Sequence, residues 1–188
     1  LRVWLDDERH GAFVLGPGFG DLEKARQFVS LLGDKSVVLD ADAITAFRDD
    51  TDVLFERITS GAGKFVLTPH EGEFARLFAD LAADGRLSKI EKAQVAAARS
   101  GAVLVYKGAD TVIASPDGRA LVNTNAPASL ATAGSGDVLA GIIGALLAQG
   151  APAFEAAAAG VWLHGEAGDR AGAGMTAEDL AHAVRPFG

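Results

Sequence analysis

Short apolar runs alternate along the chain with segments whose apolar residues recur at helical spacing. Residues 11–15 predict a buried strand, and residues 22–32 predict a helix that ends at Gly33, a typical C-cap. The same alternation predicts strands at 36–40, 64–68 and 102–107, and helices at 43–47, 71–78 and 88–100. Strands that alternate with helices form parallel sheets, joined by crossover helices and covered on both faces.

The pattern changes after residue 110. Residues 111–115 and 119–123 flank Pro116-Asp-Gly118, in which proline fixes φ and glycine takes a positive φ, so we expect a β-hairpin. Only helical patterns follow, at 136–149, 153–171 and 176–184, the last with Thr176 as N-cap and Asp179 at the capping-box position. We therefore predict an α/β fold with a mostly parallel central sheet flanked by helices, a C-terminal β-hairpin and a helical tail. Because no repeat or linker interrupts the pattern, we expect residues 1–188 to form a single domain.

Composition narrows the function classes. The 188 residues are 49% hydrophobic and 22% charged, which is typical of a soluble globular domain, and no apolar run approaches the ~20 residues that span a bilayer. The formal charge of −8, with scattered basic residues, argues against nucleic acid as a partner. The sequence has no cysteine, which excludes disulfides and thiolate chemistry and suits a reducing cytoplasm.

The strongest indication of chemistry is Gly134-Ser-Gly-Asp137, which opens an apolar helix. Glycines there let backbone N–H groups converge at the positive end of the helix, which creates an anion site suited to phosphate. Asp137 in the first turn could accept a proton from a hydroxyl held at that site, or could simply cap the helix. The segment is not a P-loop, because the Gly-Lys-Ser/Thr ending is absent.

Two further motifs follow predicted strands. His70 lies in Thr68-Pro-His-Glu-Gly-Glu73, at a carboxyl strand end where ligands collect in parallel sheets, although Glu71 and Glu73 fit a capping role better. Lys107-Gly-Ala-Asp-Thr111 offers a point charge and a glycine that lets a ligand approach the backbone, or is an ordinary strand end.

Three weaker features remain. Gly16-Pro-Gly-Phe-Gly20 departs from the dinucleotide fingerprint but suggests a backbone close to a ligand. Asp40 and Asp42 could hold a magnesium water shell or a substrate hydroxyl, and Asp42 could instead cap a helix. His164 is either structural or near a nucleotide.

Taken in order, these motifs resemble the ribokinase-like superfamily, most closely its NAD(P)H-hydrate dehydratases. The resemblance covers nearly the whole chain, and Thr68-Pro-His-Glu-Gly-Glu73 best separates the dehydratases from sugar and vitamin kinases. It implies that ADP or ATP, with Mg²⁺, phosphorylates the hydroxyl of hydrated NADH or NADPH (NADHX or NADPHX), and that loss of phosphate restores the nicotinamide ring. No protein metal-ligand set is predicted.

The resemblance also implies residue roles. Asp137 would be the catalytic base and, with Gly18, Gly20 and His70, would contact the hydrate. The residues expected at the nucleotide are Lys107, Gly108, Ala109, Asp110, Thr111, Gly134, Ser135 and Gly136.

Two departures from the family pattern stand out. Ser135 replaces a threonine found in many relatives, and nothing matches the family's additional N-terminal portion, so we expect a domain lacking it. We also expect a homo-oligomer and an NAD(P)H-hydrate epimerase domain or partner. A small-molecule kinase of the same superfamily and a non-catalytic nucleotide-binding module remain as alternatives.

Overall fold

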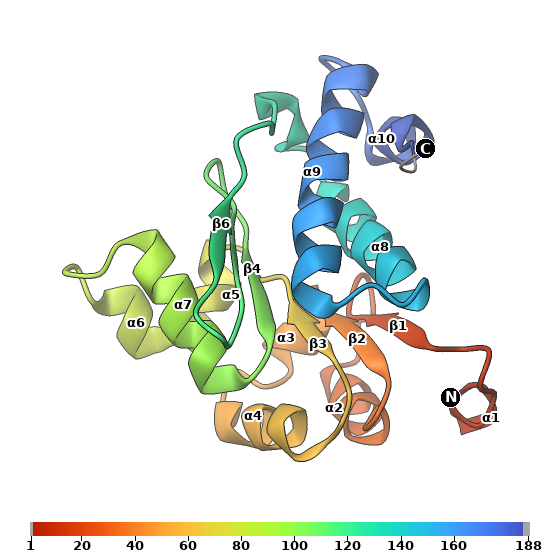
Figure 1. The fold of residues 1–188 in the computed structure, drawn as a ribbon, viewed down its shortest axis with the longest axis vertical. Helices are drawn as coiled ribbons and strands as arrows, with labels where there is room; N and C mark the ends of the chain where they lie inside the picture. Colours follow the sequence, from red (N-terminus) through yellow and green to blue (C-terminus); the bar gives the residue numbers. More distant parts are fainter. Residues whose placement is uncertain (1, 186–188) are drawn as a thin grey trace.

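A computed structural model describes residues 2–185. Six strands form one sheet in the order β1-β2-β3-β4-β5-β6, and the first four are parallel (Figure 1). The strands are β1 (Ala12–Leu15), β2 (Ser36–Leu39), β3 (Phe65–Leu67), β4 (Val103–Tyr106), β5 (Val112–Ala114) and β6 (Ala120–Val122). Strands β4, β5 and β6 pair antiparallel, so the predicted hairpin and the mostly parallel sheet are confirmed.

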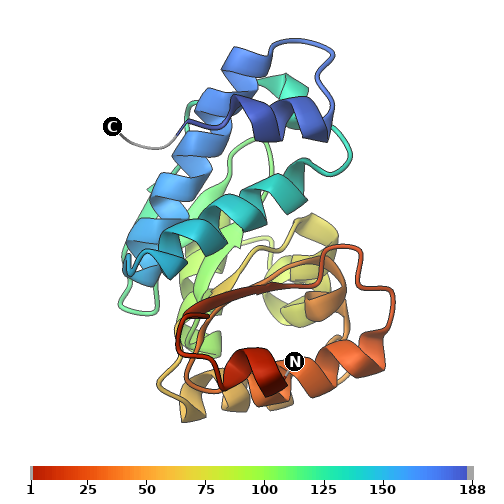
Figure 2. The same ribbon diagram turned by 90° about the vertical axis from the view of Figure 1, so that its right-hand side faces the viewer.

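Strand order explains which helices cover which face. Each connection from β1 to β4 advances in the same direction, and right-handed crossovers then place the intervening helices on the same face. The opposite face is covered by α8 and α9, and α10 packs against both (Figure 2). The helices are α1 (Arg2–Leu5), α2 (Leu22–Leu31), α3 (Ala41–Thr45), α4 (Thr51–Ser60), α5 (Glu71–Leu77), α6 (Ala79–Ala83), α7 (Lys89–Ser100), α8 (Ser135–Ala148), α9 (Ala153–Ala171) and α10 (Ala177–Ala183), with a 3₁₀ turn at Ala128–Leu130.

The core forms on both faces of the sheet. Because successive side chains of a strand point to opposite faces, Val37 and Leu39 join the core beneath α2–α7, whereas Val38 packs with α8 and α9. All three side chains are fully buried. Within residues 2–185, no helix combines the length and the apolarity needed to cross a membrane.

Most predicted elements are present, and the main differences concern four helices. Helices α1, α4 and α6 were not predicted, and α3 begins two residues earlier than expected. Helix α4 presents Leu54, Phe55 and Ile58 to the core, a helical spacing that the sequence contains. The predicted Thr176–Asp179 capping box is confirmed.

Candidate active site

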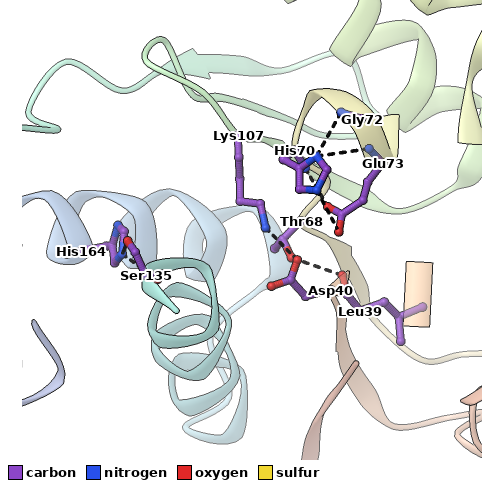
Figure 3. Close-up of polar contacts among 9 residues, drawn as sticks. All are labelled: Leu39, Asp40, Thr68, His70, Gly72, Glu73, Lys107, Ser135 and His164. Carbon is purple, nitrogen blue, oxygen red and sulfur yellow. Dashed lines mark hydrogen bonds and ion pairs between the residues drawn. The ribbon is translucent and has the colours of Figure 1, made fainter. Parts of the chain in front are cut away.

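The carboxyl ends of β2 and β4, which flank β3, bring two side chains together beside the first turn of α8. Lys107, which follows β4, places its Nζ 2.7 Å from Oδ1 of Asp40, which follows β2 (Figure 3). A Cβ added to Gly136 would lie 3.2 Å from that Nζ and 3.7 Å from Oδ2 of Asp40. The ion pair therefore lies against the N-terminus of α8, and only a small residue at position 136 leaves it room.

Asp40 is 1% exposed, so its charge depends on Lys107 and on the positive end of α8 for compensation. The next residue, Ala41, has φ of 46°, a left-handed conformation that residues other than glycine seldom adopt. The backbone is thus strained between Asp40 and Asp42.

Helix α8 begins without a side-chain cap, so the positive end of its dipole can serve an anion, although the amides of Ser135 and Asp137 already donate to backbone carbonyl oxygens at 3.3 and 3.1 Å. Gly134 is the N-cap residue with φ of 82°, and the helix has no side-chain cap hydrogen bond there. Asp137 lies in the first turn, as the sequence predicted, and it is exposed. Ser135 is buried, and its Oγ lies 3.0 Å from Nε2 of His164 on α9 (Figure 3).

His164 fixes the start of α8 to α9. Its Nε2 also lies 2.9 Å from the carbonyl oxygen of Ser135. Burial lowers the pKa of His164 below the ordinary 6.5, and the charge of Lys107 lowers this pKa further. His164 is therefore a neutral side chain near neutral pH.

His70 is the N-cap of α5. Its Nδ1 accepts hydrogen bonds from the amides of Gly72 (3.0 Å) and Glu73 (3.3 Å), and Oε2 of Glu73 accepts one from the amide of His70 (2.9 Å). Since Nδ1 is an acceptor, the proton of the neutral ring is on Nε2. The ring is 56% exposed, and the hydrogen bonds of the cap, drawn in Figure 3, fix its orientation. The predicted capping role of Glu73 is confirmed.

The glycines of the loop after β1 have different surroundings. A Cβ on Gly16 would clash with the carbonyl oxygen of Asp40, so this glycine allows a close approach to the protein's own backbone. By contrast, a Cβ added at Gly18 or at Gly20 would have no heavy atom within 4 Å other than those of its chain neighbours. Asp42 accepts a hydrogen bond from the amide of Gly20 (2.8 Å) instead of capping α3.

The 107–111 loop borders a cavity of about 480 Å³. Four of the five expected loop residues line it, namely Lys107, Gly108, Ala109 and Thr111, together with His164 and the segment around the 3₁₀ turn. Asp110 points away and pairs with Lys89 at 2.6 Å.

Asp137 lines a separate cavity of about 370 Å³ with the Gly16-Pro17 turn and apolar residues of β1 and α2. A larger cavity of about 530 Å³, between α2 and α4, contains none of the predicted site residues.

Sequence reasoning missed three contacts in this region. It did not pair Asp40 with Lys107, it gave Asp42 no contact with Gly20, and it did not mention Lys89. Both aspartates follow a strand, which was the available signal, whereas Lys89 gave none. In the described part of the chain, no group of three or more His, Asp or Glu side chains could hold a metal ion.

The sheet and the glycine-led start of α8 define a ribokinase-like α/β domain. The chain belongs to the NAD(P)H-hydrate dehydratase family, which matches residues 2–185.

Three similar proteins illustrate the relationship. An ADP-dependent (S)-NAD(P)H-hydrate dehydratase from Neisseria meningitidis serogroup B is 44% identical over 184 residues, or 93% of this chain and 60% of the relative. A bifunctional NAD(P)H-hydrate repair enzyme from Gloeobacter violaceus is 43% identical over 97% of this chain and 36% of the relative. The crystal structure of the ADP/ATP-dependent NAD(P)H-hydrate dehydratase from Bacillus subtilis, co-crystallised with ATP/Mg²⁺ and soaked with CoA, has a TM-score of 0.79 at 30% identity, covering 97% of this chain and 68% of that one. The chain thus spans 60% or less of the two sequence relatives.

Proposed function

We propose that this domain carries out the nucleotide-dependent dehydration of NAD(P)H hydrate. The observation that carries the proposal is the start of α8, where an uncapped helix terminus, the Lys107 ammonium and the exposed carboxylate of Asp137 occur together. The first two suit a phosphoryl group, and the third suits the hydroxyl that accepts it. Family membership and the names of the relatives support the choice of substrate.

Each residue has a defined part in this mechanism. Lys107 and the first amides of α8 bind the phosphate oxygens and balance the charge that spreads over them during transfer. Asp137 takes the proton from the hydrate hydroxyl as the hydroxyl oxygen bonds to the terminal phosphorus of the nucleotide. The phosphoanhydride bond breaks in the same step, and AMP (from ADP) or ADP (from ATP) leaves with its electrons. Phosphate then leaves the hydrate with the electrons of the carbon–oxygen bond, and the neighbouring ring carbon gives up a proton to water, which restores the double bond. Phosphorylation helps because phosphate is a better leaving group than hydroxide.

The residues present fit a nucleotide with its magnesium ion. The cavity beside the 107–111 loop gives the nucleotide a binding surface, and Oδ2 of Asp40 faces the start of α8. Mg²⁺ commonly takes one or two carboxylates and fills its remaining positions with phosphate oxygens and water. A single carboxylate here is therefore sufficient. The Bacillus subtilis relative was crystallised with ATP and Mg²⁺.

Gly18, Gly20 and His70 are proposed to contact the hydrate. Open space next to both glycines and the exposed, oriented ring of His70 support this assignment. We further propose a cytoplasmic homo-oligomer that works with an epimerase domain or partner. The exposed apolar side chains of Val3, Trp4 and Val14 favour self-association, which light scattering would measure.

The test is Asp137→Asn in the intact protein, supplied with NADH hydrate, ADP or ATP, and Mg²⁺. We expect turnover, followed by the absorbance of the restored nicotinamide, to fall about a hundredfold or more, while nucleotide affinity changes little. Asp52→Asn is the matched control, because Asp52 occupies the first turn of α4, outside the site.

Near-normal turnover in Asp137→Asn would remove this residue from the mechanism. A wild-type protein that fails to restore NADH but accumulates a stable phosphorylated alcohol would be a kinase instead. One that binds ADP without turning over either substrate would be a non-catalytic nucleotide-binding module.

A further inference from the structure

Lys89, the first residue of α7, reaches the back of the 107–111 loop. Its Nζ donates to Oδ1 of Asp110 at 2.6 Å and to the carbonyl oxygen of Lys107 at 3.4 Å. The same Nζ lies 4.7 Å from the centroid of the Tyr106 ring, within the range of a cation–π interaction. One ammonium group thus contacts three of the residues that form or precede the loop.

Gly108 makes this contact sterically possible. Its φ of 158° lies at the edge of the left-handed region, and an added Cβ would lie 2.6 Å from Nζ of Lys89. The missing side chain leaves room for the ammonium group on one side of the loop. On the other side, Gly108 lines the cavity assigned to the nucleotide.

Lys89 lies over a stacked aromatic pair, Tyr106 and Phe74. The Tyr106 ring is stacked on Phe74 with centroids 4.0 Å apart and an interplanar angle of 4°, and its hydroxyl donates to Oε2 of Glu71 at 2.6 Å. Burial and this hydrogen bond to a carboxylate raise the pKa of Tyr106, so the phenol remains protonated. Because Glu71 directly follows His70, the hydrogen bond between Tyr106 and Glu71 links the start of the 107–111 loop to the residue proposed to bind the hydrate.

We propose that Lys89 is a positioning residue that holds the 107–111 loop in its nucleotide-binding shape. This proposal rests on the proposed function, because it assigns a further residue to the same site. Lys89 acts on the loop and not on the nucleotide, since its charge is already matched by Asp110 and it does not line the cavity. Without the Lys89 ammonium, Asp110 and the Lys107 carbonyl lose a hydrogen-bond donor. The loop then samples other conformations, and ordering it again costs binding free energy when the nucleotide binds.

The test compares Lys89→Met with Asp110→Asn in the intact protein, using ADP as the probe. Lys89→Met removes the donor of this contact and Asp110→Asn removes the negative charge of its acceptor, so both should raise the Kd and the KM for ADP, by up to about tenfold, the scale of one lost charged hydrogen bond, with kcat nearly unchanged. The double variant should bind ADP no more weakly than either single variant. Lys92→Met is the matched control, because Lys92 lies on the same helix but donates to the carbonyl oxygen of Ala82.

Asp110→Asn keeps the test decisive if Lys89→Met folds poorly, since the Asp110 side chain is 66% exposed. If Lys89 bound phosphate directly, releasing it from Asp110 would tighten ADP binding, and that result would overturn the proposal. Unchanged ADP affinity in both variants would also overturn it, while wild-type binding and turnover would leave the proposed function intact. If the wild-type protein itself binds no ADP, both proposals fail together.

Discussion

At the scale of single residues, the candidate site depends on how one buried carboxylate is neutralised. Asp40 and Lys107 are 67 positions apart in sequence and meet only because β2 and β4 both neighbour β3. The sequence placed each residue at a strand end but could not pair them, because strand order is a property of the assembled sheet. The pairing means that Lys107 has a structural role before any ligand arrives.

Lys107→Met should therefore lower stability as well as nucleotide binding. It leaves the carboxylate of Asp40 buried without a partner, which costs about 3 kcal/mol of unfolding free energy in comparable pairs. Adding Asp40→Asn should recover much of that loss, because the amide carries no charge. Urea denaturation of the single and double variants measures both effects, and equal stability of Lys107→Met and wild type would contradict this account of the ion pair.

His164 should make stability depend on pH. Burial, opposed by the hydrogen bond to Ser135, holds its folded-state pKa below the ordinary value of 6.5. The unfolded chain therefore takes up a proton at a higher pH than the folded protein does. The contribution is fully present above pH 6.5 and is lost as pH falls toward the lower folded-state pKa.

Urea denaturation at about pH 7.5 and about pH 5.5 should show this loss for the wild type and a smaller loss for His164→Gln. His182→Gln is the control, since His182 is an exposed residue of α10, and it should keep the wild-type dependence. An unchanged pH dependence in His164→Gln would assign the effect to other groups.

At the scale of elements, the position of α8 depends on glycines that let it pack closely against β1 and α9. A Cβ on Gly144 would lie 2.4 Å from Cγ2 of Val14 on β1, and one on Gly160 of α9 would lie 2.6 Å from Cγ1 of Ile143. These glycines let α8 lie close to both neighbours. The sequence predicted the helix, but the partners of its glycines become known only from the packing.

Gly144→Ala and Gly141→Ala form a matched pair on this helix. A Cβ at Gly141 meets nothing within 4 Å, so alanine there should stabilise the helix by about 0.8 kcal/mol. At Gly144 the same propensity gain is opposed by a clash with Val14, for which overpacking costs about 1–3 kcal/mol. The first variant should therefore be the more stable in urea, and equal stabilities would mean that Val14 moves aside freely.

Local signals explain which elements could be predicted. The capping box at Thr176 lies within four residues and was recognised, whereas α6 follows α5 after a break at Phe78 that no glycine or proline marks. Helix α4 buries residues at helical spacing, so hydrophobic periodicity could have predicted it.

At the scale of the whole molecule, the proposed nucleotide cavity joins two layers. Its lining comes from the loop after β4 and from Leu139, Val161 and His164 of α8 and α9, which cover the opposite face from α7. A ligand in this cavity contacts both the loop after β4 and the C-terminal helices α8 and α9. Separation of these layers during unfolding would therefore release it.

ADP should consequently raise the melting temperature of the whole domain. At about 100 times its Kd, a ligand that binds only the folded state adds about 2.7 kcal/mol, which corresponds to roughly 5–10 °C for a chain of this length. Lys107→Met should melt earlier and gain much less from ADP, because it removes a cation from the cavity wall and the partner of Asp40. Calorimetric melts with and without ADP measure both, and Arg57→Met, in the cavity between α2 and α4, serves as the control. A shift abolished by Arg57→Met but kept by Lys107→Met would place the nucleotide in that other cavity, and the mechanism built on α8 would then be wrong.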